Sequence, residues 1–439
     1  MRGGLPLSRA FLLQMCWRVF AALLALVWWS DVLAQLPSAE PPEVKAPAQG
    51  TGLSRWFNPE TAPFIPVPLI GADPDSGTTL GILPTWIVTN DKQDITKIIA
   101  PDIQHNPYFG WGAHGRIFAY PSEDEQWSVM AGIKQRVERE FDAEFQYGRE
   151  RKKRWSFTAS VIYERDGTPR FFGLGNHTQQ SAETNYTGEQ EVAQVQAGYN
   201  ISKIWQLLYT ARARQVDVLA GTLTGVPSIE KLFPHALGLG RHREALSRMS
   251  LVYNTLDDIT VPSHGLKLVE YAGIASRAGL FNDSLYTEAG FDGRGYFRVT
   301  PETILATHLA LRYLLSAKDV PFWALSSLGG DQSEIAGEQL LRGFGAGRYY
   351  DRNSSSISVE VRRHVISFNA VSTHVDLEVA PFVDLGRVFG RLSTMPFGQL
   401  HHVYGVGFRG IARPFVVGYV DVGYGSNGAA VFTGISYPF

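Results

Sequence analysis

The chain has 439 residues, and its 40 basic and 42 acidic side chains leave a net charge of −2, which gives no support for a nucleic-acid partner. Glycine is abundant, with 44 residues, and aromatic residues make up 12% of the chain, while charged residues make up only 19%. This mixture favours a β-rich protein with many turns and an apolar exterior. A mean hydropathy of −0.08 fits such a protein even in a membrane, because alternating strands dilute their own apolar signal.

Residues 1–34 are predicted to be a secretory signal peptide. Basic residues precede the apolar run 19–29, and Val32 and Ala34 occupy the small-residue positions expected before a cleavage point. A membrane anchor is the alternative, but the run is shorter than the roughly 20 residues that a spanning helix needs. The only cysteine, Cys16, lies inside this segment, so we expect a mature chain without a disulfide. No later apolar run approaches spanning length, and an exported membrane protein of this kind must be a β-barrel.

Residues 35–70 are predicted to be a periplasmic linker, since their first part is rich in proline, alanine and glycine and lacks periodicity. Residues 71–439 are predicted to form the barrel. In the stretch 155–164, Trp155, Phe157 and Val161 share one face while polar residues share the other, which is the strand signal. A soluble sandwich also alternates, but it could not bury the dense charge of the polar faces, whereas a watery lumen could.

About sixteen strands are expected, the first beginning near Gly77 and a single long one running from Trp127 to Tyr147. Short links follow the even strands and long ones follow the odd strands, as in barrels whose two termini are periplasmic. The sequence stops on a strand in which Val431, Tyr437 and Phe439 share a face. A closing strand with a terminal aromatic residue is what bacterial outer-membrane barrels present to their assembly machinery.

Proline occurs in both strands that are expected to meet when the barrel closes, at Pro84 in the first and Pro438 in the last. Each proline removes a backbone donor, so we hypothesise a seam that is short of hydrogen bonds and can part sideways. The alternative is that both prolines lie at strand ends outside the bilayer.

The stretch "LRGFGAGRYYDRN", residues 341–353, is a glycine-rich loop that nevertheless contains Arg342 and Phe344. Together with "FVDLGRVF", "YNTLDDITVPSHGLKL", "RFFGLGNHT" and "YGVGFRG", it resembles the barrel of the BamA/TamA-type outer-membrane proteins, also called the bacterial surface antigen family. The resemblance implies a transmembrane antiparallel barrel whose long outer loop, after the eleventh strand, folds into the lumen. The short linker implies a barrel-only member without N-terminal periplasmic modules.

In that family the loop arginine contacts acidic side chains of the inner wall, which makes Arg342 the expected pin and Asp384 its carboxylate. Strand alternation adds Glu378 and Glu360 as inward-facing carboxylates, while Gly343 and Phe344 belong to the pinned loop. An inward arginine among such carboxylates is expected to be paired more strongly than on a surface. The alternative is an exposed arginine on a mobile outer loop.

No catalytic residue, metal site or cofactor is predicted. Ser354 and His364 could serve a wall-bound lipase, but hydroxyls lining a polar strand explain them better. His401 and His402 lack the further ligands that a metal needs. The basic run 149–154 fits a solvated turn, with binding to anionic lipid as the alternative.

Three functions remain open. The first is a non-enzymatic outer-membrane barrel that helps to insert or translocate protein or lipid components, with outer-membrane lipids and the assembly machinery as partners and an unknown client. The second is a passive solute pore. The third is a structural or surface-antigen barrel that acts only through its outer loops.

Overall fold

The structure is a computed structural model, and it describes residues 65–439 except 90–94, 123, 149–150, 278–279, 371–372, 413–415 and 436. The predicted signal peptide, 1–34, and most of the predicted linker lie outside the described residues. Within the described part of the chain, no helix has the length and apolar character needed to span a bilayer.

One antiparallel sheet of twenty strands dominates the described residues. Its first ten strands are β1 (Ile65–Asp73), β2 (Gly77–Thr89), β3 (Ile95–Ile99), β4 (Asp102–Asn106), β5 (Gly110–Ser122), β6 (Glu125–Lys134), β7 (Arg139–Tyr147), β8 (Trp155–Asp166), β9 (Arg170–Phe171) and β10 (Thr184–Asn200). The other ten are β11 (Trp205–Ala220), β12 (Gly240–Asn254), β13 (Gly265–Arg277), β14 (Leu280–Thr300), β15 (Thr303–Ala317), β18 (Asn353–Ala370), β19 (Thr373–Phe389), β20 (His401–Ala412), β21 (Val416–Gly425) and β22 (Gly428–Ile435).

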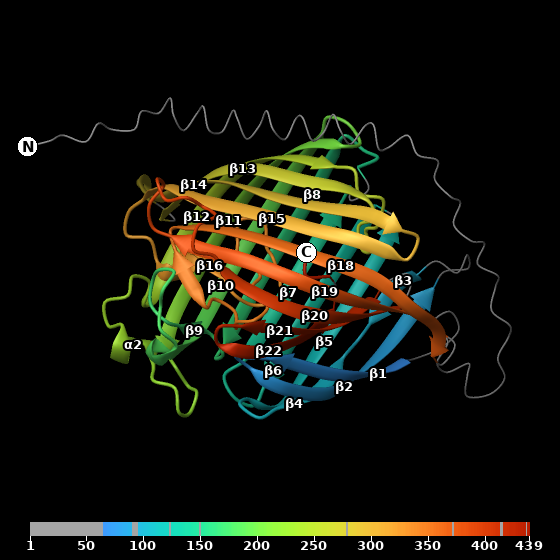
Figure 1. Ribbon diagram of the computed structural model, residues 1–439, viewed down its shortest axis with the longest axis horizontal. Helices are drawn as coiled ribbons and strands as arrows, with labels where there is room; N and C mark the ends of the chain where they lie inside the picture. Colours follow the sequence, from blue (N-terminus) through green and yellow to red (C-terminus); the bar gives the residue numbers. More distant parts are fainter. Residues whose placement is uncertain are drawn as a thin grey trace, which may run out of the picture. The chain divides into compact units, whose positions relative to one another are not determined.

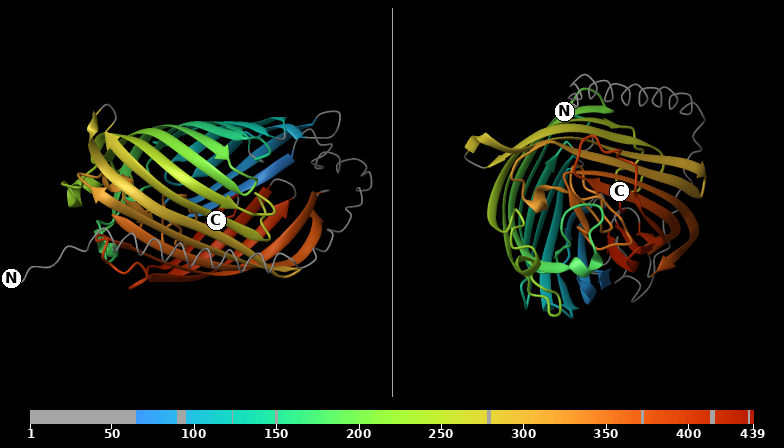
Figure 2. Two further views of the ribbon diagram at one scale, coloured as in Figure 1. Left: turned by 90° about the horizontal axis from the view of Figure 1, so that it is seen from above. Right: turned by 60° about the vertical axis from the view of Figure 1, so that its left-hand side comes forward.

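Outside this sheet, β16 (Ser326–Leu328) pairs with β17 (Tyr349–Asp351). The described residues also contain one short helix, α2 (Ile229–Leu232), and two 3-10 turns, η2 (Gln180–Ala182) and η3 (Phe322–Ala324). The large sheet curls until β1 and β22 lie side by side (Figure 1). The right panel of Figure 2 shows the strands as a ring around the orange segment between β15 and β18. The predicted all-β barrel is confirmed.

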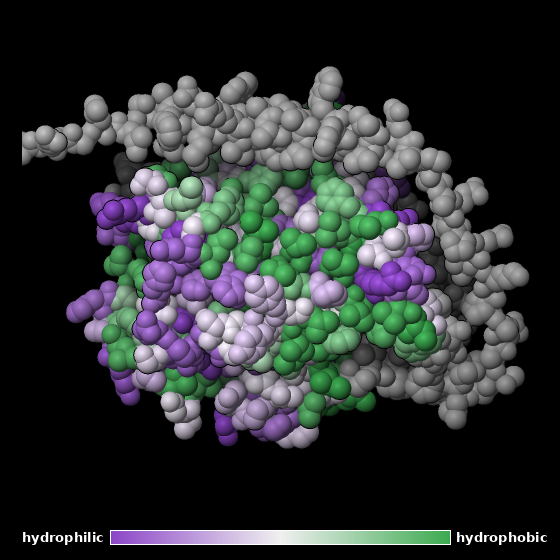
Figure 3. Space-filling view, in the orientation of Figure 1, coloured by the Kyte–Doolittle hydropathy of each residue, from purple (hydrophilic) through white to green (hydrophobic). Residues whose placement is uncertain are grey.

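Alternation sorts the side chains between the two faces of the sheet. On β8, Trp155, Phe157 and Val161 are 49%, 43% and 52% exposed, while the polar residues between them are partly buried. On the face shown in Figure 3, apolar side chains gather over the strands and hydrophilic ones gather mainly at the end where Figure 1 places α2 and β9. Apolar surface of this extent on the outside, with charges inside, is the pattern of a membrane barrel.

The strand list differs from the sequence prediction in two places. Counting the interrupted strand β3–β4 once and leaving out the two-residue β9, the described residues form eighteen barrel strands, not about sixteen. Strands β6 and β7 form a hairpin where one long strand was expected. Ala131 pairs with Phe141 across this hairpin, so odd-numbered residues of β6 pair with odd-numbered residues of β7. The apolar odd-numbered side chains therefore stay on one face of the sheet on both sides of the turn.

Strand β1 is the second difference, because it begins at Ile65, inside the predicted linker 35–70. Two prolines in "IPVPL" hid it from the pattern. The prediction that Pro84 lies in the first strand is therefore wrong. Pro84 lies in β2, opposite Pro66 of β1, and takes no part in the contact between the first and last strands.

The long connections leave one end of the barrel. Because neighbouring strands are antiparallel, β8, β11 and β15 run in the same direction, and the connections 167–183, 221–239 and 318–352 follow them. The expected parity of long and short links is therefore present with eighteen strands as well. The last of these connections, residues 318–352, is called the plug loop below.

Residues 437–439 lie outside the sheet. Tyr437 and Phe439 are 8% and 5% exposed, whereas Val431 on β22 is 39% exposed. Phe439 packs with Tyr296 of β14 and Leu340 of the plug loop. The predicted shared face of Val431, Tyr437 and Phe439 is therefore wrong, because the strand ends at Ile435 and the alternation ends with it.

Candidate functional site

The plug loop folds back on itself inside the ring of strands. Its two arms pair as β16 and β17, and the tip between them is held by backbone hydrogen bonds from Gly329 to Gln339, from Gly330 to Phe344 and from Leu341 to Gly330. Gly329 has φ +137°, in the region that favours glycine. The loop thus presents residues 341–344 as a compact unit.

An apolar contact seats this unit on the barrel wall. Leu341 and Phe344 are buried, and they cluster with wall side chains of β19 and β20 and with other loop residues, namely Leu328, Tyr349, Phe382, Val388 and Val403. Gly343 lies so close to β21 that an added Cβ would stand 2.7 Å from the backbone nitrogen of Gly425. Glycine at this position is required for the close approach.

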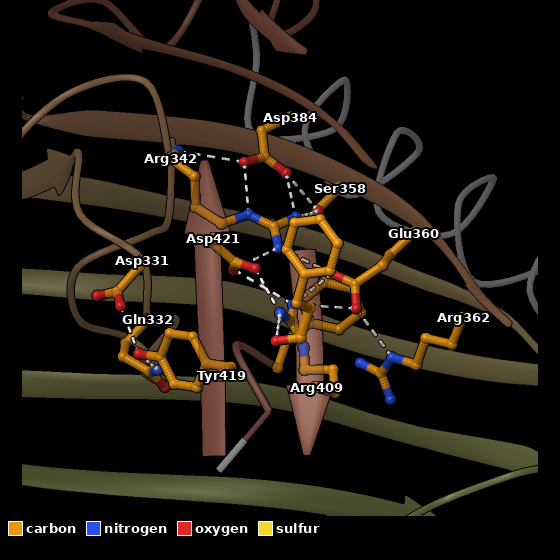
Figure 4. Close-up of polar contacts among 12 residues, drawn as sticks. Asp331, Gln332, Arg342, Ser358, Glu360, Arg362, Asp384, Arg409, Tyr419 and Asp421 are labelled. Atoms are coloured by element: carbon orange, nitrogen blue, oxygen red, sulfur yellow. Dashed lines mark hydrogen bonds and ion pairs between the residues drawn. The ribbon is translucent and has the colours of Figure 1, made fainter. Parts of the chain in front are cut away.

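Arg342 contacts three wall carboxylates at once (Figure 4). Its Nε and Nη2 donate to the two oxygens of Asp384, both at 2.9 Å, and its backbone nitrogen donates to Asp384 Oδ2 at 3.1 Å. Its Nη1 donates to Glu360 at 2.8 Å and to Asp421 at 3.0 Å. The guanidinium also lies 3.4 Å from the ring centre of Phe382. This two-pronged pairing needs the planar fork of arginine, which lysine lacks.

The charges of this site balance. Arg409 pairs with Asp421 and Glu360, and Arg362 Nε donates to Glu360 at 3.0 Å, so three guanidinium groups face three carboxylates. Burial by itself lowers the pKa of Arg342, but Asp384, Glu360 and Asp421 reverse this and hold its pKa well above the ordinary value. A buried cluster of this kind is tolerated because each charge lies beside an opposite charge.

The structure brings together Arg342, Gly343, Phe344, Asp384 and Glu360 of the predicted pin. It places Glu378 elsewhere, where its carboxylate accepts a hydrogen bond of 2.9 Å from the Tyr437 hydroxyl.

Two members of the site escaped the sequence prediction, Asp421 and Arg409. The signal was present, since Val420 and Val422 are outward and 40% and 37% exposed, which leaves Asp421 to face inward.

A second contact joins the plug loop to the turn between β1 and β2. The ideal Cβ position of Gly345 lies 2.4–2.6 Å from the Asp75 carboxyl group, so loop and turn are in close contact. Glu338 accepts a hydrogen bond from the backbone of Gly347. Next to them is a cavity of about 510 Å³ whose charged lining is mostly acidic: Asp73, Asp75, Glu138, Glu140, Glu164, Asp166 and Glu338 against Arg116, Lys134, Arg139 and Arg165.

Burial raises the pKa of Asp75 to about 7 and that of Glu338 to about 8, from 3.8 and 4.5. The charged groups that face them are Asp73, Arg170, Glu183, Glu334 and Asp331. Among these only Arg170 is a cation. Docking of the loop therefore buries two carboxyl groups, Asp75 of the turn and Glu338 of the loop, in surroundings that favour their neutral forms.

Docking of the plug loop is expected to weaken as the pH rises from 5.5 to 8.5. Because the pKa values of Asp75 and Glu338 are raised in the docked state, their protonation stabilises docking fully below about pH 4. This stabilisation of docking is lost as the pH rises through the two pKa values, about 7 and about 8. Ionic conductance of the reconstituted barrel reports the loss. Glu338→Gln should remove roughly half of the pH dependence, because Asp75 still titrates, while replacement of the exposed Glu302 in Glu302→Gln should leave it intact. If the conductance of Glu338→Gln depends on pH as much as that of the native barrel does, Glu338 is not one of the groups that control docking.

The other candidates for chemistry are engaged in packing. His401 stacks on Tyr349 with ring centres 4.0 Å apart, and its Nε2 lies 2.8 Å from the Asn176 carbonyl. Ser354 is buried at the start of β18, and His364 Nε2 lies 2.8 Å from the Ser367 hydroxyl. Over the ranges that the structure describes, no three His, Cys, Asp or Glu side chains are placed to hold a metal ion.

Comparison with known proteins gives one family. The model described as the Omp85 superfamily domain matches residues 125–411. No curated protein matches the chain.

Three solved barrels are similar to the chain. BamA from Haemophilus ducreyi lacking POTRA domains 1-3 has 15% identity and a TM-score of 0.49, with 81% of this chain and 75% of that chain covered. CdiB from Acinetobacter baumannii has 12% identity and a TM-score of 0.42, with 85% and 59% covered. CdiB from Escherichia coli has 10% identity and a TM-score of 0.45, with 84% and 62% covered.

Proposed function

Because the chain belongs to the Omp85 superfamily, we propose that it is a non-enzymatic barrel of the Gram-negative outer membrane that assists the insertion or translocation of protein or lipid components. Its partners in this role are outer-membrane lipids, the assembly machinery during its own biogenesis, and a client polypeptide or lipid. The joint between β1 and β22 is the observation that carries the proposal.

Strands β1 and β22 are neighbours, yet among the described residues no backbone ladder joins them. Each of the other adjacent pairs of barrel strands has a ladder, such as the nine-residue one between β1 and β2. The side chain of Thr433 makes two hydrogen bonds across the joint. Its hydroxyl accepts from Ala72 N at 2.7 Å and donates to Ile70 O at 3.1 Å.

The sequence of β1 keeps this joint short. Backbone N–H groups of alternate residues in a strand point to the same side, and that of Ala72 points to β22. Thr433 bonds to positions 70 and 72, so in an antiparallel pairing positions 66 and 68 point to the same side but lie beyond the end of β22 at Ile435. Both are proline and have no N–H. Since a backbone hydrogen bond contributes about 0.5–1.5 kcal/mol, a joint without a backbone ladder parts at low cost.

Cross-linking the joint is expected to abolish insertion. Cysteines at Ala72 and Thr433, whose backbone and side chain are in contact, are oxidised in barrels reconstituted into liposomes. The measured quantity is the rate at which a urea-unfolded outer-membrane barrel protein acquires its folded, heat-modifiable form. We expect at least a fivefold acceleration by the native barrel, loss of that acceleration on oxidation, and recovery after reduction.

The matched control places cysteines at Val422 and Val431, which are ladder partners on β21 and β22. That cross-link leaves the joint free and should leave the rate unchanged. If the oxidised joint inserts protein as fast as the reduced one, sideways opening is not the mechanism.

The plug supports the same function over a passive pore. The wall and the loop fill the lumen at Arg342 with buried, paired charges, and such a stopper opposes free passage of solutes. Single-channel recording, described below with the Arg342 variants, separates the two possibilities.

A further inference from the structure

The segment Tyr437–Phe439 is bound inside the lumen by groups of five other elements. The backbone nitrogen of Ser333, in the plug loop, donates to the carbonyl of Pro438 at 3.1 Å. Tyr296 on β14 donates its hydroxyl to the main-chain oxygen of Phe439 at 2.8 Å. These two bonds recognise the backbone of the segment, as a binding site for an extended peptide does.

The aromatic rings are recognised as well. The guanidinium of Arg362, on β18, lies 3.7 Å from the ring centre of Tyr437 and 5.6 Å from that of Phe439. His308 on β15 stacks on Phe439 with ring centres 5.3 Å apart and planes 18° apart. The Tyr437 hydroxyl donates to Glu378 on β19. We call the six contacting residues the lumen seat: Tyr296, His308, Ser333, Leu340, Arg362 and Glu378.

The seat is held in place without the segment that occupies it. His308 pairs with Asp292 at 2.9 Å, and Asp292 in turn pairs with Arg294 at 3.0 Å. Arg362 is fixed by Glu360, which also binds the plug-loop arginine. A preformed concave site with a few aimed polar groups is the general form of a ligand site.

Arg362 also has unused binding capacity. Its side chain is 1% exposed, yet neither Nη1 nor Nη2 has a hydrogen-bond partner among the residues that the structure describes. Buried guanidinium donors are normally satisfied, so this pair indicates that the resident segment does not exhaust what the seat can bind. A peptide carbonyl or carboxylate placed beside the two rings would satisfy both donors.

We infer that the lumen seat is a binding site for an extended aromatic peptide of the pattern Tyr-x-Phe, and that residues 437–439 are its built-in, displaceable occupant. Only one residue separates the segment from β22, so its binding in the lumen removes residues 437–439 from the edge that β1 offers. As the place where a client strand end is held, the site rests on the proposed function. As a peptide site, it is testable without that function.

The experiment empties the seat in the folded full-length barrel. The variant Tyr437→Ala/Phe439→Ala is titrated with a fluorescein-labelled peptide Gly-Ile-Ser-Tyr-Pro-Phe, and anisotropy gives the affinity. We expect binding at least tenfold tighter than to the native barrel, where the tethered segment competes at millimolar effective concentration. In the emptied barrel, Arg362→Gln should weaken binding about tenfold, and the outward-facing Arg363→Gln should not change it.

Equal affinity for the native and emptied barrels would overturn the inference, as would equal effects of Arg362→Gln and Arg363→Gln. If the emptied variant does not fold, the native chain is tested with a photo-crosslinking benzoylphenylalanine at position 439. The cross-link should form with β14 or β15, and excess peptide should lower its yield. A yield that peptide does not change would show that the segment is fixed packing and not a ligand.

The two proposals fail separately. Peptide binding together with no acceleration of protein insertion would leave the seat standing and remove the proposed function. Insertion activity together with no peptide binding would leave the proposed function standing and rule out the lumen seat as a peptide site.

Discussion

Replacing Arg342 with alanine is expected to lower the free energy of unfolding of the barrel by about 3–5 kcal/mol and to raise its ionic conductance. The substitution leaves Asp384, Glu360 and Asp421 buried around an empty space. Removing one partner of a buried ion pair is costly because the remaining charges are uncompensated. With its main polar attachment gone, the plug loop should leave the wall for much of the time.

Charge balance makes this prediction more specific. Arg342→Ala leaves two guanidinium groups facing three carboxylates, so a second substitution, Asp384→Asn, should restore part of the lost stability. Arg342→Lys keeps the charge but cannot donate to both oxygens of Asp384 while reaching Glu360. We therefore expect the lysine variant to lie between the native protein and the alanine variant.

Urea unfolding in lipid vesicles and planar-bilayer recording measure the two effects. Arg363→Ala is the control, since its pair with Glu302 is exposed and such pairs contribute little. A native barrel that already conducts steadily, with no increase in Arg342→Ala, would favour the passive pore and contradict the plug.

Alternation made much of this structure predictable. It correctly sorted β8 and the paired side chains of β18 and β19, because a strand between hydrocarbon and water has only two environments to offer. Arg342 and Asp384 were brought together by the family resemblance, since nothing in local sequence connects residues 42 positions apart.

The failures have physical causes too. Strand β1 was missed because proline, here Pro66 and Pro68, has no backbone N–H and is therefore usually evidence against a strand. The edge of β1 that faces β2 nevertheless forms a complete ladder. Tyr437 and Phe439 were placed on one face with Val431 because they continue the pattern of β22. A pattern of residue types does not show where the backbone leaves the ladder, and here distant groups such as Tyr296 and Ser333 decide it.

Replacing Gly423 with alanine is expected to raise the conductance as much as Arg342→Ala does, although it removes no charge. A Cβ on Gly423 would stand 2.1 Å from the carbonyl oxygen and 2.6 Å from the carbonyl carbon of Arg342. Both are backbone atoms, and Gly343 next to them is already in close contact with β21, so the loop can relieve the overlap only by lifting away. Overpacking of this kind costs about 1–3 kcal/mol.

Gly418 provides the control on the same strand. An alanine there meets nothing within 4 Å, so Gly418→Ala should leave conductance and stability unchanged or slightly improved. Glycine weakens a strand interior, and the intrinsic effect of both substitutions is therefore mildly stabilising. A loss of stability in Gly423→Ala together with no loss in Gly418→Ala would come mainly from the overlap with the plug loop, because the next nearest atom, Val403 Cγ1, is 3.1 Å away. If Gly423→Ala remains as closed and as stable as the native barrel, the loop does not rest on β21, and the contacts of Arg342 cannot be what closes the lumen.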